Sequence, residues 1–122
     1  MSDSTNSTGK SGESRACTHM LSLGFRIRET NWRHRKDEVD IIVENEEFIV
    51  FVEVKTRQNN SYGNPEDFVT KKKQRFMIRA ANAYIDAYNI EKEVRFDIIA
   101  ITLDAGENAL EYIPNAFYPI VK

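Results

Sequence analysis

The chain of 122 residues has the length of one domain, and its 41% hydrophobic and 30% charged residues are ordinary for a globular protein. Its single cysteine, Cys17, excludes an intramolecular disulfide and a cysteine-rich zinc site, so any metal is expected to be a hard ion with oxygen ligands. The net charge of −2 argues against broad attraction to polyanions. The sequence has no signal-peptide core and no apolar run of the roughly 20 residues that span a bilayer, which predicts a cytoplasmic protein with no membrane partner.

The N-terminal part of the chain combines a polar tail with two short elements. Residues 1–11 are rich in Ser, Thr, Asn and Gly, which predicts a disordered tail ahead of a single domain over residues 12–122. A helix is expected from about Gly12 to Leu23, with Glu13 in its first turn, where a carboxylate complements the helix dipole. A strand over residues 25–30 and a polar loop over residues 31–36 follow. Their basic side chains are expected to border the carboxylates of the next element, as solvated surface or as phosphate-binding groups: Arg26, Arg28, Arg33, Arg35 and Lys36.

Residues 37–55 organise the rest of the chain. Two runs rich in β-branched and aromatic residues flank a polar break, which predicts a hairpin that turns on Asn45 and Glu46. One face of this hairpin is then wholly apolar: Val39, Ile41, Val43, Phe48, Val50, Val52 and Val54. The other face carries Glu38, Asp40, Ile42, Ile49, Phe51, Glu53 and Lys55. In this register Asp40 and Glu53 are diagonal neighbours, roughly 7–8 Å apart at the backbone, whereas a three-residue loop would separate them.

The acidic residues of this hairpin allow two interpretations. Taken alone, Glu53 and Lys55 form an ordinary ion pair on a half-exposed strand. However, the strand around Glu53 is apolar enough to be buried on both faces, and clustered carboxylates there are costly unless something neutralises them. The oxygens of Asp40 and Glu53 are therefore expected to converge on one hard cation, Mg²⁺ or Mn²⁺.

The second half of the chain predicts a helix and two strands. The helix starts at Asn64 and Pro65 and runs to about Tyr88, either continuously or with a break near Thr70. A break would place lysines in the first turn of a separate helix, against the dipole preference, as happens most often at functional sites. A buried strand over residues 94–103 and an edge strand over residues 109–113 follow, and the tail over residues 115–120 is expected to pack on the core. The fold class is therefore α/β, a mixed sheet of about five strands flanked by helices in the order αβββαββ.

Four segments in this order resemble the YraN-like family of small uncharacterised bacterial proteins. They are Glu38-Val39-Asp40-Ile41-Ile42, Phe51-Val52-Glu53-Val54-Lys55-Thr56-Arg57, Arg95-Phe96-Asp97-Ile98-Ile99-Ala100-Ile101 and Asn115-Ala116-Phe117. The resemblance extends from about Gly12 to Phe117. The family is itself similar to the restriction-endonuclease-like superfamily, the PD-(D/E)xK nucleases, which implies an endonuclease-like core.

The superfamily pattern places one acid on the first hairpin strand and an acid-x-lysine motif on the next, which Asp40 and Glu53 with Lys55 match. The resemblance implies Mg²⁺ or Mn²⁺ held by Asp40, Glu53, the carbonyl of Val54 and Glu13. Lys55 is then expected to orient or activate water, or to stabilise charge on phosphate. Contacts to a nucleic-acid backbone are expected from Arg33, Arg35, Lys71, Lys73 and Arg75.

The implied function is hydrolysis of phosphodiester bonds, in DNA or structured nucleic acid, by a metal-dependent nuclease. Two alternatives stay open: a non-catalytic nucleic-acid-binding module that retains the nuclease fold, and a protein whose basic surfaces recruit an acidic protein partner. A homodimer formed through the apolar C-terminal tail is a further expectation. The chain has Asp37 where the family usually has glycine, and this extra negative charge is expected to hinder approach of a phosphate backbone.

Overall fold

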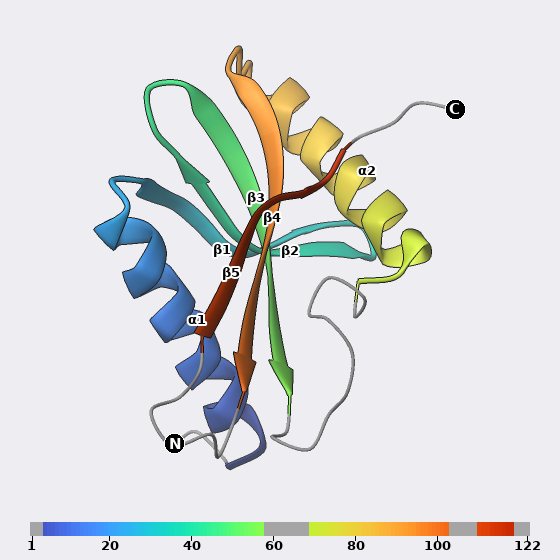
Figure 1. Ribbon diagram of the computed structural model, residues 1–122. Coiled ribbons are helices and arrows are strands. Elements are labelled where there is room, and N and C mark those ends of the chain that lie inside the picture. Colours follow the sequence, from blue (N-terminus) through green and yellow to red (C-terminus); the bar gives the residue numbers. More distant parts are fainter. Residues whose placement is uncertain (1–3, 58–68, 103–109, 119–122) are drawn as a thin grey trace.

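The computed structural model describes residues 4–57, 69–102 and 110–118 (Figure 1), with side chains from Gly12 onward. The order of elements is helix, three strands, helix and two strands, as the sequence predicts. Their bounds are α1 Ser4–Ser22, β1 Arg26–His34, β2 Asp37–Glu44, β3 Phe48–Arg57, α2 Lys71–Tyr88, β4 Glu93–Thr102 and β5 Leu110–Phe117. Neither of these two helices is long and apolar enough to cross a membrane within the described ranges.

The five strands form one mixed sheet between the two helices. The strand order is β1-β2-β3-β4-β5, in which β3 and β4 are parallel and every other neighbouring pair is antiparallel. The parallel pair is joined through α2, as parallel strands require a crossover connection. Helix α1 covers one face of the sheet and α2 covers the other (Figure 1). The predicted fold class is therefore confirmed.

The central strand β3 is buried on both faces, so its side chains divide the core into two layers. On the α2 side, Ile49 and Phe51 pack in a cluster with Met77 and Tyr84. On the α1 side, alternate strand residues pack in a second cluster with the helix residues Ala16 and Met20: Ile41, Val43, Val50, Val52, Ile99 and Ile101. The hairpin residues of this second cluster, Ile41, Val43, Val50 and Val52, all belong to the face that was predicted to be apolar.

The register of the β2–β3 hairpin differs from the prediction by two residues. Ile42 pairs with Phe51 rather than with Ile49, so the turn is wider than the expected two residues. The Asn45 side chain stabilises this wider turn, because its Oδ1 accepts hydrogen bonds from the backbone N–H groups of Glu47 at 2.8 Å and Phe48 at 2.7 Å. A shift of two residues leaves the side-chain alternation unchanged, which is why the predicted faces survive the wrong register.

Strand β2 leaves β3 at Asp40. The last pair of the ladder is Ile41 with Val52, and Val39 packs in the α2 cluster beside Trp32 instead of on the face of Ile41 and Val43, where it was expected. Asn31, the β1 residue that faces Asp40 in this register, has a positive φ of 54°. The far ends of β1 and β2 therefore curl away from the sheet and lie against α2 (Figure 1).

The N-terminal elements are longer than predicted. Helix α1 begins at Ser4 rather than at Gly12, so the backbone of residues 4–11, expected in the disordered tail, is helical. Ser, Thr and Asn compete for backbone hydrogen bonds and offer no apolar stripe, so the pattern indicates a tail even where a nucleated helix can extend. Strand β1 runs to His34, which reduces the expected loop over residues 31–36 to a turn at residues 35–36.

The last strand continues past the proline where it was expected to end. Strand β5 includes Pro114, which is tolerated because an edge strand leaves one side of its backbone unpaired. Phe117 is 8% exposed and its ring lies 5.0 Å from that of Phe96, so this part of the tail packs on the core as expected. The remaining tail residues after Tyr118, and the predicted helix start at Asn64, lie outside the described residues.

The Asn45 turn generates a stability prediction. Replacing Asn45 with Ala leaves two backbone N–H groups without their acceptor, which should lower the free energy of unfolding by about 1 kcal/mol. Urea unfolding followed by circular dichroism measures the change. Glu46→Ala, an exposed substitution in the same turn, is the control and should change the stability little. Equal effects of the two variants would contradict the role given to the Asn45 side chain.

Candidate functional site

The divergence of β2 from β3 places two carboxyl groups at the end of the ladder. Asp40 and Glu53 are the next residues after the last paired positions, so they face each other directly and are not the diagonal neighbours expected from the sequence. Asp40 Oδ2 accepts a hydrogen bond of 2.8 Å from the Val54 N–H, in the place of a further strand-to-strand bond. The Glu53 side chain is 7% exposed, and its Oε1 is buried without a hydrogen-bond donor.

Burial and mutual repulsion keep this pair from ionising fully. Burial first, and then the negative charge of Asp40, raise the pKa of Glu53 from 4.5 to about 7. Burial also raises the pKa of Asp40, against the effect of the Val54 N–H that stabilises its charged form. Near neutral pH the two groups therefore share a proton, and a cation placed between them would remove the reason for retaining it.

Two lysines act on Glu53 from different elements. Lys55 lies two residues further along β3, on the same face of the strand, and its charge favours the ionised form of Glu53. Lys73 approaches from α2, with its Nζ 3.7 Å from Glu53 Oε1, which is longer than a hydrogen bond. Glu53 and Lys55 thus share one face of β3, and the charges of Asp40, Lys55 and Lys73 all act on Glu53.

The start of α2 decides between the two alternatives left open for this helix. Thr70 is the N-cap residue, and its side chain accepts a hydrogen bond of 3.1 Å from the Lys73 N–H. The first turn of α2 contains Lys71, Lys72 and Lys73 and no acidic residue, so a separate helix begins here with three cations at its positive end.

Glu13 lies next to the acid pair but is held by another residue. Its Oε1 accepts a hydrogen bond of 3.0 Å from the Asn31 side chain, and its negative charge contributes to the raised pKa of Asp40. In the described part of the chain, no three Asp, Glu, His or Cys side chains are grouped closely enough to hold a metal ion. Glu13 therefore belongs to the surroundings of the pair, and the first ligands would be Asp40 and Glu53.

The backbone of Val54 adds a third oxygen to this donor set. The N–H and the carbonyl of a strand residue point to the same side, so the Val54 carbonyl is directed toward the gap into which its N–H donates to Asp40. Two carboxylates and one carbonyl are hard oxygen donors, and Mg²⁺ in proteins is commonly bound by one or two carboxylates with water and substrate phosphate. The buried, unpartnered Oε1 of Glu53 fits such an ion.

The residues predicted to bind a nucleic-acid backbone lie on the β1–β2 hairpin and on α2, which contact each other. Arg79 of α2 binds Asp37 at the start of β2, which holds the β1–β2 turn against α2 (Figure 1). Arg35 is exposed in this turn, and Arg33 next to it is 70% exposed and 3.6 Å from Glu38. The remaining predicted side chains lie on the first turns of α2, where two are exposed and one approaches Glu53: Lys71, Arg75 and Lys73.

Asp37 does not present the free negative charge that was expected. Its side chain is 6% exposed, and both of its oxygens accept hydrogen bonds of 3.1 Å from Arg79. This bidentate pair joins residues that are 42 positions apart, so no local sequence signal predicts it. The carboxylate at position 37 is neutralised and fixes the hairpin to α2.

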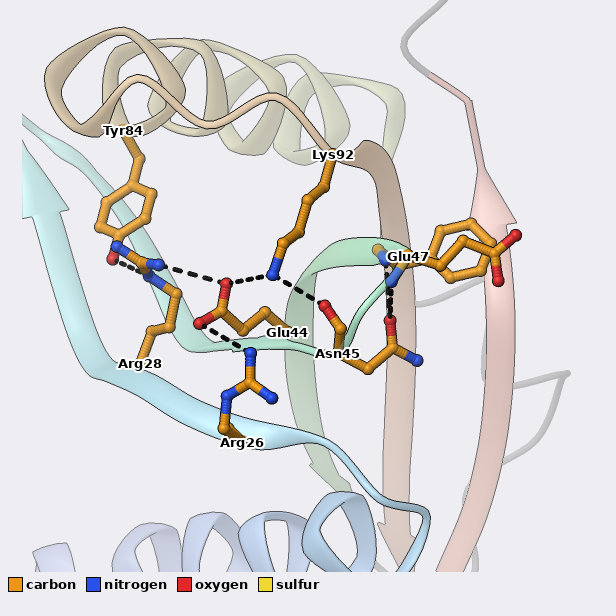
Figure 2. Close-up of polar contacts among 8 residues, drawn as sticks. Arg26, Arg28, Glu44, Asn45, Glu47, Tyr84 and Lys92 are labelled. Carbon is orange, nitrogen blue, oxygen red and sulfur yellow. Dashed lines mark hydrogen bonds and ion pairs between the residues drawn. The ribbon is translucent and has the colours of Figure 1, made fainter.

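Arg26 and Arg28 do not border the acid pair, in contrast to the prediction. They bind Glu44 at the opposite end of β2, together with Lys92 from the segment that precedes β4 (Figure 2). The nitrogen–oxygen distances are 3.4 Å, 3.2 Å and 2.9 Å, respectively. Lys92 also donates to the Asn45 carbonyl, so this cluster holds the hairpin turn in place.

Two of the segments that carry the family resemblance contact each other. Asp97, which is fully buried, accepts hydrogen bonds from Arg95 at 3.1 Å and 2.8 Å and from the Asn115 N–H at 2.8 Å. Tyr112 donates a further hydrogen bond of 2.5 Å to the same carboxylate. This network anchors β5 to β4, so Asp97 has a structural role. Its oxygens accept hydrogen bonds, whereas Glu53 Oε1 accepts none.

Fold and site together define a small mixed α/β protein. Where two of its strands separate, it carries a buried pair of carboxyl groups whose charge is not fully compensated by neighbouring cations. The chain belongs to the uncharacterised protein family UPF0102, whose model matches residues 12–101. A UPF0102 protein of Phocaeicola vulgatus is 41% identical over 114 residues, which cover 93% of this chain and 94% of that protein. A UPF0102 protein of Chlorobium phaeobacteroides is 44% identical over 116 residues, covering 89% and 92%, respectively. The predicted resemblance to the YraN-like family is thereby confirmed.

The raised pKa of Glu53 predicts how the stability of the metal-free protein depends on pH. In the unfolded chain Glu53 loses its proton near pH 4.5, whereas in the folded protein it keeps the proton until about pH 7. The free energy of unfolding should therefore fall as the pH rises through this window, by roughly 3 kcal/mol at most for this group. Glu53→Gln should remove that part of the fall, which urea unfolding across the pH range in EDTA measures.

Glu46→Gln is the matched control, because Glu46 is exposed in the hairpin turn. It should leave the pH profile of the parent protein unchanged. A Glu53→Gln profile as steep as that of the parent would show that Glu53 ionises normally in the folded state.

Proposed function

We propose that this protein is a metal-dependent nuclease that hydrolyses phosphodiester bonds in DNA or structured nucleic acid. The observation that supports the proposal most is the buried Asp40 and Glu53 pair, with one unpartnered oxygen, beside Lys55 on the same strand face. This arrangement resembles the pattern of the restriction-endonuclease-like superfamily, in which one acid is followed by an acid-x-lysine motif on the next strand. Membership of UPF0102 specifies no activity, so the proposal rests on the geometry and on that resemblance.

In this proposal Asp40, Glu53 and the Val54 carbonyl hold Mg²⁺ or Mn²⁺. The ion, when bound, polarises the scissile phosphate and lowers the pKa of a bound water. Glu13, which accepts a hydrogen bond from Asn31, would add negative charge beside Asp40. The low exposure of Glu53 strengthens every charge interaction in the site, because water is largely excluded from it.

Lys55 is the group that acts on the reacting atoms. Its ammonium lies on the same strand face as Glu53, where it orients or activates the attacking water or stabilises the charge that develops on the phosphate. The first turns of α2 and the β1–β2 turn supply backbone contacts through Lys71, Arg75, Arg33 and Arg35. Such contacts predict binding that weakens with salt and shows little sequence preference.

The alternative is a nucleic-acid-binding module that retains this fold without turnover. One observation favours it: within the described ranges, the acids do not form a three-ligand group around a common point. Metal titration by calorimetry separates the two functions, because a module would bind nucleic acid but no Mg²⁺ or Mn²⁺ at millimolar concentration. A homodimer through the C-terminal tail stays a prediction.

The nuclease proposal predicts that Glu53→Ala abolishes cleavage. Purified protein with Mn²⁺ should cut at least one of three labelled substrates, namely single-stranded, duplex or branched DNA, as resolved on denaturing gels. The variant should lose both cleavage and Mn²⁺ binding, because it removes one of two carboxylate ligands. Glu46→Ala, treated identically, is the control for contaminating nucleases and should keep full activity. Cleavage that persists in Glu53→Ala would place the activity elsewhere.

Lys55→Ala should separate chemistry from metal binding. Loss of a group that acts only on water and phosphate should lower the rate by about 10²- to 10⁴-fold while Mn²⁺ affinity stays within a few fold of the parent. Single-turnover kinetics and calorimetry give the two values on the same preparation. Glu46→Ala, an exposed substitution in the β2–β3 turn, is the control. A Lys55→Ala rate equal to that of the control would exclude the role proposed for Lys55.

A further inference from the structure

Lys73 occupies the place where a counter-cation for the acid pair is needed. Its Nζ lies 3.7 Å from Glu53 Oε1, the buried oxygen that accepts no hydrogen bond. Its positive charge also acts on Asp40, so one ammonium faces both carboxyl groups. Even with the charge of Lys55 nearby, Glu53 Oε1 accepts no hydrogen bond, which leaves the pair open to a stronger cation.

The position of Lys73 in α2 is unfavourable for the helix itself. Lys73 lies in the first turn, where the helix dipole favours acidic residues, and two further lysines precede it. A lysine retained against this local preference indicates that its partner lies outside the helix. The only partner that the structure gives for its side chain within the described residues is the acid pair.

Arg79, another cation of α2, makes a tighter contact with its carboxylate than Lys73 makes with Glu53. Arg79 donates two hydrogen bonds of 3.1 Å to the buried Asp37 and satisfies both of its oxygens. Lys73 instead stands beyond hydrogen-bond distance from Glu53, and its side chain remains 35% exposed. The Arg79–Asp37 contact is therefore a fixed bidentate ion pair. The Lys73–Glu53 contact is purely electrostatic, so Lys73 can leave it for another partner.

We propose that Lys73 is the internal counter-cation of Asp40 and Glu53 in the metal-free protein, and that a divalent ion displaces it toward substrate phosphate. This inference rests on the proposed function, because it assumes that the same two carboxylates bind the ion. Lys73 then has two alternative partners, the carboxylates before the ion binds and a phosphate afterwards. Metal and nucleic acid consequently favour each other's binding, and by linkage the gain is the same in either order.

The first experiment measures competition between Lys73 and the ion. Mn²⁺ is titrated into parent protein, Lys73→Met and Lys72→Met by calorimetry at about pH 8.5, above the pKa of Glu53. Lys72 is exposed on the same helical turn, so its variant removes the same charge from the helix start without touching the acid pair. Lys73→Met should bind Mn²⁺ about tenfold tighter than Lys72→Met, because no ammonium competes for the carboxylates.

The second experiment measures the counter-cation role without any metal. A double-mutant cycle of Lys73→Met and Glu53→Gln, followed by urea unfolding in EDTA, gives the coupling between the two side chains. Lys73→Met alone should destabilise the protein more than Lys72→Met does, and Glu53→Gln should abolish that difference. Saturating Mn²⁺ should abolish it as well, since the ion takes over the charge compensation.

The third experiment tests whether Lys73, once displaced by the ion, increases the affinity for nucleic acid. Fluorescence anisotropy with a labelled oligonucleotide, at two salt concentrations, compares binding with Ca²⁺ and with EDTA, so that cleavage plays no part. The metal-dependent gain in affinity should be equal in parent protein and Lys72→Met, and several fold smaller in Lys73→Met.

The outcomes distinguish this inference from the proposed function. Equal Mn²⁺ affinities in Lys73→Met and Lys72→Met, in proteins that bind the ion, would overturn the displacement and leave the metal site standing. A parent protein that binds no Mn²⁺ would overturn both the displacement and the nuclease proposal. Zero coupling in the metal-free cycle would show that Lys73 is not the counter-cation of Glu53.

Discussion

The hydrogen bond from the Val54 N–H to the Asp40 carboxylate is the interaction on which the site depends. It replaces the next bond of the β2–β3 ladder, so the two strands separate there without leaving that N–H unpaired. The separation opens a gap at which Asp40 and Glu53 face each other, and it turns the rest of β2 toward α2. If the ladder continued instead, both carboxyl groups would stand on a regular sheet face beneath a helix.

Helix α2 completes the site because it is the crossover between the parallel strands β3 and β4. A crossover must return over one face of the sheet, and here that is the face that carries Glu53. The clamp between Arg79 and Asp37 fixes the curled hairpin against the helix, which sets the distance at which Lys73 stands from the acid pair. The positive start of α2, the exposed β1–β2 turn and the carboxylates are thus held as one arrangement.

The sequence predicts the faces of the sheet better than it predicts the contacts of its charges. Alternation with period two survives a register error of two residues, so Glu53 and Lys55 keep their face although the hairpin turn is wider than expected. The turn itself depends on the Asn45 side chain binding backbone N–H groups, and apolar patterning carries no information on such bonds.

The partners of the basic residues were not predictable in the same way. A charge pair between distant segments is decided by the path of the chain, as the bond between Arg79 and Asp37 illustrates. Arg26 and Arg28 lie on the same strand as Arg33, yet the direction of β1 carries them to Glu44 at the other end of β2. Sequence proximity to an acidic cluster therefore indicates little until the strand directions are known.

The two ends of β2 show how satisfied and unsatisfied carboxylates differ within one sheet. Burial acts to raise the pKa of Glu44, but hydrogen bonds from Lys92 and Arg28 more than compensate and lower it (Figure 2). At Glu53 burial acts in the same direction, Asp40 adds to it, and the charges of Lys73 and Lys55 do not compensate, so the pKa rises to about 7. Three cations bind the single carboxylate of Glu44 directly. At the acid pair, Lys73 stands 3.7 Å from Glu53, and together with Lys55 it leaves the two carboxylates with a deficit of positive charge. That deficit, and not the mere presence of acidic residues, is the physical reason why we propose Asp40 and Glu53 as the ligands of a metal ion.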